Sequence, residues 1–234
     1  MYEGVRARPD GESTVARLAS TAADYGFEGV VVRNHGDART DYDAERVREA
    51  SGVDVVDGLE VRADGPETAS GAVGNYRREV TLLLLHGGTP ELNRFAVEQP
   101  RVDVLAHPMR GDGDFNHVLA KAARENGVRV EFDLSPVLRR SGGQRVQALS
   151  KLRKLREVVE HYDAPYVVSA DAASHLQLRA PGELIAVGEA VGFSADQVEA
   201  GLREWGHLAE RNRERQSEAF IEPGVERGRY EEEH

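Results

Sequence analysis

Short runs of apolar residues recur along the chain, and turn residues and a helical pattern follow each of them. Near-continuous apolar runs of this length are typical of parallel strands that are covered on both faces. The six clearest runs cover residues 29–33, 55–61, 80–85, 102–106, 128–132 and 166–170, and a weaker one at residues 2–8 starts the series. Each run predicts a buried β-strand.

Helical periodicity predicts four helices between and after these strands. In three of them apolar residues share one face, and the fourth opens with the capping-box sequence Ser194-Ala195-Asp196-Gln197. These helices cover residues 14–25 (apolar Val15, Leu18, Ala19, Ala22), 115–126 (Val118, Leu119, Ala122, with Gly127 as its C-terminal cap), 146–162 (Leu149, Leu152, Leu155, Val159) and 194 to about 214.

The alternation of strand and helix predicts an α/β fold built from βα units around a parallel sheet. A closed barrel and an open doubly wound sheet both fit this pattern. No glycine-rich dinucleotide fingerprint follows the first strands, which disfavours a Rossmann domain. Residues 1–220 are predicted to form a single α/β domain. Residues 221–234 lose periodicity and include Glu231-Glu232-Glu233, so an acidic, flexible C-terminal tail is expected there.

Composition narrows the class of protein. The chain of 234 residues is long enough to bury a core, and it contains no cysteine, which excludes disulfides, cysteine metal sites and cysteine nucleophiles. Its longest apolar run, residues 80–85, is far too short to span a membrane, and the first residues show no signal-peptide pattern. We therefore expect a cytoplasmic protein with no membrane partner.

The chain is strongly acidic, with 41 Asp and Glu against 30 Lys and Arg and a net charge of −11. Only three of the basic residues are lysines: Lys121, Lys151 and Lys154. An acidic composition that is poor in lysine resembles that of proteins from halophiles, where net charge serves solubility in brine. An ordinary acidic protein that avoids nucleic acid is the alternative, and only the local distribution of charge separates the two.

One stretch, residues 137–156, contains seven basic residues and neither Asp nor Glu. We call it the basic segment. Binding of a polyanion explains such a stretch in an acidic chain, whereas ion pairs with acids on neighbouring elements are the alternative. Residues 139–144 precede the predicted helix and are expected to form a flexible loop whose glycines allow close approach to phosphates. The candidate RNA-binding residues here are Arg139, Arg140, Arg145, Lys151, Arg153 and Lys154.

Polar residues at the predicted strand ends suggest metal-dependent phosphoester hydrolysis as an enzymatic alternative. The carboxyl ends of barrel strands form active sites, and histidines with carboxylates bind Zn, Mn or Mg. The candidates are His35, Glu60, His86, His107, Glu131, Asp133 and Asp171. The chain has no His-x-His pair and no His-Glu-x-x-His motif, and the first strand offers no histidine. We therefore expect no metal, because single histidines more often pack, cap or contact RNA.

Residues 130–149, with the sequence VEFDLSPVLRRSGGQRVQAL, resemble the family of archaeal ribonuclease P protein component 3. The family is the archaeal relative of a barrel-fold subunit of eukaryotic nuclear ribonuclease P. Residues 102–108 (VDVLAHP), 166–172 (YVVSADA), 174–176 (SHL) and 178–184 (LRAPGEL) are similar to the same family. The resemblance is clear over residues 94–192. The acidic tail and the acidity elsewhere depart from the family.

The resemblance implies a TIM-like βα barrel of seven or eight mostly parallel strands, related to phosphoesterases of the polymerase-and-histidinol-phosphatase (PHP) type but without their metal site. It implies a non-catalytic subunit of ribonuclease P that binds the catalytic RNA and supports 5′-end maturation of precursor tRNA. Catalytic Mg is expected on the RNA, and no cofactor on this chain. The implied partners are ribonuclease P RNA, precursor tRNA through the complex, a smaller ribonuclease P protein subunit and other ribonuclease P proteins. Arg179 and, less clearly, Arg110 join the candidate RNA contacts.

Overall fold

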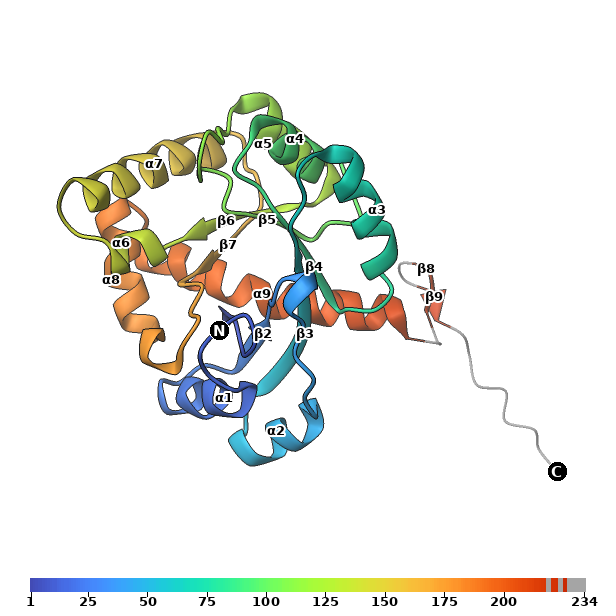
Figure 1. Cartoon of the computed structure of the whole chain (residues 1–234). Helices are drawn as coiled ribbons and strands as arrows, with labels where there is room; N and C mark the ends of the chain where they lie inside the picture. Colours follow the sequence, from blue (N-terminus) through green and yellow to red (C-terminus); the bar gives the residue numbers. More distant parts are fainter. Residues whose placement is uncertain (218–219, 223–224, 227–234) are drawn as a thin grey trace.

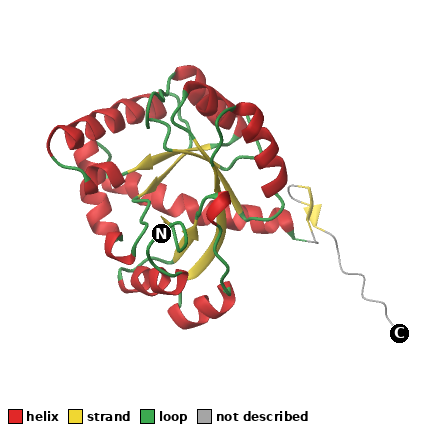
Figure 2. Cartoon of the chain, viewed as in Figure 1, coloured by secondary structure: helices red, strands yellow, loops and turns green. Residues whose placement is uncertain are grey.

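The computed structural model describes residues 1–217, 220–222 and 225–226. Seven parallel strands form one sheet, and each strand pairs with the next one along the chain. The sheet curves into a barrel that helices surround (Figures 1 and 2). The strands are β1 (Tyr2–Val5), β2 (Gly29–Val32), β3 (Asp54–Val61), β4 (Leu82–His86), β5 (Val104–Ala106), β6 (Arg129–Asp133) and β7 (Tyr166–Ser169).

All seven strands were predicted from the apolar runs. The ends of the six clearest runs agree with the observed strands to within two residues, and the weaker first run is shorter than expected. Leu82, Leu83, Leu84 and Leu85 of β4 are all fully buried, which shows that both faces of the sheet are covered. The α/β class and the barrel of parallel strands are confirmed, with seven strands in a nearly closed sheet.

The connecting segments are mostly helical. The helices are α1 (Val15–Asp24), α2 (Ala44–Ser51), α3 (Pro66–Tyr76), α4 (Pro90–Val97), α5 (His117–Asn126), α6 (Ser135–Arg139), α7 (Gly142–His161), α8 (Pro181–Val191) and α9 (Ala195–Gln216), with short 3₁₀ turns η1 (Gly36–Ala38) and η2 (His175–Gln177). The four predicted helices correspond to α1, α5, α7 and α9, and the remaining five were not predicted. None of the helices in the described part of the chain is long and apolar enough to cross a membrane.

Two expectations about the helices were wrong. Residues 139–144 are not a flexible loop, because α6 ends at Arg139 and α7 begins at Gly142, leaving two residues between them. Glycine destabilises a helix mainly in its interior, and here the two glycines lie in the first turn. Val118 was placed on the buried face of its helix but is 55% exposed. The side chain of Asn116 caps the start of the helix, so Val118 lies in its first turn. The first buried residue of the helix is Leu119.

The barrel closes at only one end. β1 and β7 meet at their carboxyl ends, where Val5 bridges Ala172 and the Arg6 N–H donates to the Ala172 carbonyl at 2.9 Å. Helix α9 packs against both strands where they do not pair and crosses behind the sheet in Figure 1. The indole N–H of Trp205 donates to the Val168 carbonyl of β7 at 2.9 Å, so a helix side chain satisfies a group that strand pairing leaves free.

Two glycines allow α9 to lie this close to the strands. A Cβ atom at Gly201 would lie 2.6 Å from the Val168 side chain, and one at Gly206 would lie 2.7 Å from the Tyr2 ring. Both distances are shorter than real Cβ contacts, so a larger residue would push the helix away from the sheet.

The inside of the barrel is apolar at one end and charged at the other. Trp205, Leu208 and Ala209 of α9 pack against inward-facing strand residues that include Val31 and Leu82. Towards the carboxyl ends of the strands the buried residues become polar, and Arg33, Glu60 and Glu131 are fully buried there. We call the carboxyl end of the strands the barrel mouth.

The predicted acidic tail, residues 221–234, lies mostly outside the described residues. Within it the structure describes parts of two short antiparallel strands, β8 (Phe220–Glu222) and β9 (Val225–Glu226). The boundary at residue 220 and the flexibility of the tail stay predictions.

Candidate functional site

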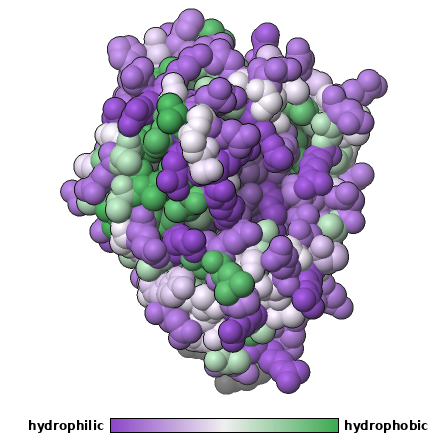
Figure 3. Space-filling model, turned by 60° about the vertical axis from the view of Figure 1, so that its left-hand side comes forward, coloured by the Kyte–Doolittle hydropathy of each residue, from purple (hydrophilic) through white to green (hydrophobic). Residues whose placement is uncertain are grey.

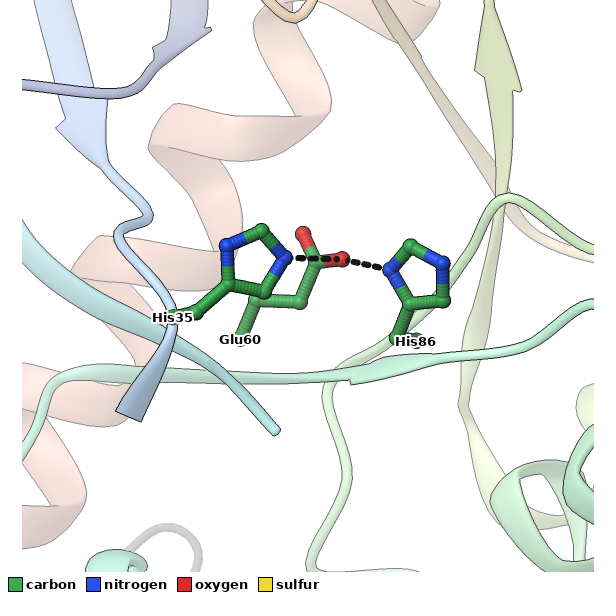
Figure 4. A group of neighbouring side chains, drawn as sticks. All are labelled: His35, Glu60 and His86. Atoms are coloured by element: carbon green, nitrogen blue, oxygen red, sulfur yellow. Dashed lines mark hydrogen bonds and ion pairs between the residues drawn. The ribbon is translucent and has the colours of Figure 1, made fainter. Parts of the chain in front are cut away.

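The barrel mouth brings together the polar residues that were predicted from the strand ends. They come from six strands or the residues just after them: His35, Glu60, His86, His107, Glu131, Asp133 and Asp171. In Figure 4 the rings of His35 and His86 lie on either side of the Glu60 carboxylate. These side chains therefore converge at the barrel mouth, although convergence alone does not assign them a role.

Two groups in the mouth have the composition of metal sites. In the first, His86 Nδ1 lies 2.5 Å and His35 Nε2 lies 3.4 Å from the same oxygen, Glu60 Oε1. In the second, His107 lies with Asp133 and Asp171, and its Nδ1 is 3.1 Å from Asp133 Oδ2. Histidine and carboxylate are ligands that Zn and Mn accept, so the donor chemistry alone does not exclude a metal.

Arg33, which sequence reasoning missed, lies in the centre of the mouth. Its side chain is fully buried, donates to Glu60 Oε2 at 2.6 Å and forms a close ion pair with Glu131. Burial alone would raise the pKa of Glu60, but Arg33 and Arg6 hold the pKa of this carboxyl well below its usual range. Glu60 is therefore an ionised carboxylate inside the barrel, and it is stable there because guanidinium groups surround it.

Arg6, at the end of β1, was also missed, and it carries a second guanidinium into the mouth. Its Nε donates to Asp171 Oδ1 at 2.8 Å and its Nη2 donates to Glu60 Oε2 at 2.8 Å. Its Nη1 lies 2.9 Å from both ring nitrogens of His35. Each of the two arginines directly follows a buried apolar strand, and that position is the signal by which the sequence could have revealed them.

The arginines decide whether these residues fit a metal. A metal ion bound by His35, Glu60 and Asp171 would need the space between them, and the guanidinium of Arg6 lies there with a hydrogen bond to each. Arg6 therefore leaves no room for a metal among these three residues. The phosphoesterase alternative requires such a metal, and the geometry does not support it.

His107 is held in its protonated form by its neighbours. Burial disfavours the charged ring, but Glu131, Glu60 and the hydrogen bond to Asp133 outweigh it and raise the pKa of His107 to about 9. For Asp133, burial opposes ionisation, yet the bond to His107 and the hydrogen bonds from Ser135 lower its pKa to about 2. The two residues form a buried ion pair over a wide range of pH.

This pair predicts a loss of stability at alkaline pH. The pKa of His107 is higher in the folded chain than the usual 6.5, so its contribution is complete below about pH 6.5 and disappears as the pH rises through 9. We expect the free energy of unfolding to fall by about 3 kcal/mol across this window. Urea titrations between pH 6 and 9.5 should show this slope in the wild type and in H117Q, an exposed control, but not in H107Q. An equal slope in H107Q would assign the loss to other groups.

The basic segment forms α6, most of α7 and the link between them, and its predicted RNA-binding residues are all exposed. Most of them donate to backbone carbonyls and not to carboxylates. The contacts are Arg139 to Ala170 O (2.7 Å), Arg145 to Val137 O (2.7 Å), Lys151 to Met109 O (2.8 Å) and Arg153 to Ala190 O (2.8 Å). A carbonyl orients a cation but does not cancel its charge.

Only two of the seven basic residues pair with acids in the described part of the chain. Lys154 Nζ lies 2.7 Å from Asp114, and Arg156 Nη1 lies 2.6 Å from Glu160. The side chain of Arg140 makes no hydrogen bond to any described residue, and its backbone N–H caps α6 by donating to the Pro136 carbonyl. Among the described residues, five of the seven cations therefore have no acid partner within 4 Å.

The basic segment adjoins the barrel mouth. Arg139 also donates to the carbonyl of Asp171 at 3.2 Å, and Arg110 lies 3.5 Å from His86 Nε2 at the rim. A cavity of about 350 Å³ lies between the basic segment and the barrel mouth, and residues of both regions line it, such as His107, Arg140 and Lys151. Figure 3 views the molecule with the side of α6 and α7 turned forward. Hydrophilic and hydrophobic residues surround a hollow on this side.

Arg179 is separate from this group. It is half-buried and donates to the carbonyls of Leu176 and Leu178 in its own turn. No described contact joins it to the basic segment or to the mouth, whereas Arg110, Arg140 and Lys151 line one cavity.

Known proteins with similar sequences and structures are consistent with this arrangement. Ribonuclease P protein component 3 of Haloarcula marismortui is 66% identical over 225 residues, which cover 96% of each chain. A chain of an archaeal ribonuclease P, solved by cryo-EM with mature tRNA, has the same fold, with a TM-score of 0.82, 21% identity and full coverage of both chains. A lactonase from Listeria monocytogenes shares the barrel alone, with a TM-score of 0.58 and 11% identity over 89% of this chain and 93% of its own.

The family described as RNase P subunit p30 matches residues 1–217, which include the whole barrel. The halophilic source of the Haloarcula relative agrees with the acidic, lysine-poor composition. The match over nearly the whole chain and the 66% identity lead to the same conclusion, and the chain belongs to the RNase P subunit p30 family.

Proposed function

We propose that the chain is a non-catalytic subunit of ribonuclease P that binds the catalytic RNA through the basic segment and supports 5′-end maturation of precursor tRNA. The observation that carries this proposal is the set of exposed cations on α6 and α7 whose partners are carbonyls. Their charge remains available to phosphates, and each phosphate neutralised releases counterions. Membership of the RNase P subunit p30 family indicates that the complex is ribonuclease P.

The RNA carries out catalysis, and this chain has a structural role in the complex. Catalytic Mg belongs to the RNA, and no cofactor is assigned to the chain, whose mouth holds two of its own arginines. The proposed protein partners are a smaller ribonuclease P protein subunit and other ribonuclease P proteins. The chain contacts precursor tRNA only as part of the complex. The proposed location is the cytoplasm.

High salt favours arginine for this role. Near 1 M salt the Debye length is about 3 Å, so long-range attraction between charges is weak. Direct hydrogen bonds from guanidinium to phosphate persist under these conditions, because the donor fork matches two phosphate oxygens. Five of the seven cations of the basic segment are arginines.

The proposal is tested by precursor-tRNA cleavage with the cognate ribonuclease P RNA and the small partner subunit at moderate Mg. We expect this chain to raise the cleavage rate or to lower the Mg concentration required. If the chain leaves both unchanged, and instead hydrolyses a phosphoester alone with Mn, the subunit proposal fails and the phosphoesterase alternative returns.

Replacing Arg139, Arg140 and Arg145 together by alanine should weaken binding to the ribonuclease P RNA. The slope of log affinity against log salt should fall by about 0.7–0.9 for each phosphate that the variant no longer binds. Filter-binding titrations at several salt concentrations measure both quantities. The matched control replaces Arg48, Arg94 and Arg203, which are exposed on other helices but lie beside acids. Equal slopes for the two triple variants would exclude the basic segment as the RNA-binding surface.

A further inference from the structure

The guanidinium of Arg6 is surrounded by side chains of the types that bind metal ions. Carboxylates of Asp10, Glu60 and Asp171 accept its hydrogen bonds at 3.3, 2.8 and 2.8 Å. Ring nitrogens of His35 and His107 lie 2.9 and 3.3 Å away. The side chain is only 8% exposed, so this cation is held inside the mouth and not at its surface.

Arg6 and Arg33 share their carboxylates in the way that two bound cations do. Glu60 Oε2 lies 2.8 Å from Arg6 Nη2 and 2.6 Å from Arg33 Nη2. Asp171 Oδ1 lies 2.8 Å from Arg6 Nε and 3.8 Å from Arg33 Nε. Both carboxylates therefore bridge two positive groups.

The charge of the mouth requires both arginines. Five carboxylates gather there, and among the described residues Arg6 and Arg33 are the buried arginines that pair with them. Buried carboxylates are stable only when paired or when they bind a metal. Without Arg6 the mouth would keep its ligands, gain space and lose a positive charge.

We propose that the guanidinium of Arg6 occupies the position of a divalent cation, so that the wild-type chain binds none, and that removing this guanidinium alone creates a site for a divalent transition metal. The bound ion would be a first-row transition metal such as Zn²⁺ or Mn²⁺, because the donors are imidazole nitrogens and carboxylate oxygens. Arg6 thereby makes the barrel independent of metal supply.

The first ligands of such an ion are already oriented. Asp10 Oδ2 lies 2.7 Å from His35 Nδ1, which leaves Nε2 directed at Glu60, and a carboxylate behind a histidine is a common device for holding a metal ligand in place. His86 faces the same carboxylate from the other side, as Figure 4 shows. His35, Glu60 and His86 offer three ligating atoms within 4.8 Å of one another, and Arg6 Nη1 lies 2.9 Å from one of them, His35 Nε2.

The test compares metal binding by the wild type, R6A and R6H, with R8A as the control. Arg8 lies two residues from Arg6, but its side chain is exposed and donates to the Glu12 carbonyl. Each protein is treated with chelator, dialysed against ZnCl₂ or MnCl₂ and measured for bound metal by elemental analysis. Its thermal unfolding is then followed with and without the ion.

We expect no stoichiometric metal in the wild type and R8A, and about one ion per chain in R6A and R6H. The melting temperature of R6A and R6H should rise with Zn²⁺, since an ion that binds only the folded chain stabilises it. Addition of H35Q to R6A should abolish both effects.

Three outcomes would overturn the proposal. The first is a stoichiometric metal in the chelator-treated and reloaded wild type. The second is a folded R6A or R6H, by circular dichroism, that takes up no metal. The third is failure of both variants to fold at any concentration of Zn²⁺ or Mn²⁺, because the proposal requires that the ion replace the guanidinium.

Discussion

Replacement of Arg33 by methionine is expected to lower the free energy of unfolding by about 3–5 kcal/mol, the usual cost of removing one member of a buried ion pair. Methionine keeps much of the volume but leaves the carboxylates of Glu60 and Glu131 without their closest cation. Chemical denaturation followed by circular dichroism measures the change. R203M, at an exposed position on α9, is the control and should stay within about 0.5 kcal/mol of the wild type.

A second substitution separates charge from packing at this position. If the loss in R33M comes from the unpaired carboxylates, adding E131Q should restore part of the stability, because the neutral amide removes one buried charge. Additive losses in the double variant would instead point to packing around Arg33, including its position 5.9 Å from the centroid of the Trp205 ring.

Replacement of Trp205 by alanine is expected to lower the free energy of unfolding by about 3–5 kcal/mol, the range for large aromatic residues removed from a core. The fully buried indole fills the apolar end of the barrel and also satisfies the Val168 carbonyl where β1 and β7 do not pair. Because Trp205 is the only tryptophan, unfolding of the variant has to be followed by circular dichroism.

The phenylalanine variant isolates the hydrogen bond. W205F keeps most of the apolar volume but leaves the Val168 carbonyl unpaired, so a smaller loss of about 1–3 kcal/mol is expected. If W205F were as stable as the wild type, the barrel would not need this bond between α9 and β7. If it were as unstable as W205A, the hydrogen bond would dominate over packing.

These expectations connect the fold to the proposed function. A barrel whose mouth is cross-linked by two buried arginines and whose other end is covered by a helix is a rigid support. The basic segment is attached to that support through Arg139 and Lys151, which donate to carbonyls at the ends of neighbouring strands and loops. A surface fixed in this way loses little conformational freedom when it binds folded RNA.

Much of the fold could be predicted from the sequence, for a local reason. A parallel strand that is covered on both faces has to be almost wholly apolar, so β4 and its neighbours are visible as runs of Val and Leu. Helices with a strong apolar stripe, such as α1, were visible for the same reason. Helices α2 and α6 were missed because they are short, and α2 buries no residue fully.

The candidate site could be predicted only in part. The polar residues at the strand ends and the acid-free basic segment are properties of position and composition, so the sequence by itself determined both, along with the resemblance to the ribonuclease P family. The tertiary structure decided what these groups contact. Arg6 and Arg33 meet Glu60 across 54 and 27 residues of chain, and the cations of α7 meet carbonyls on other elements. Such pairings depend on how the barrel closes, and no local pattern of residues records them.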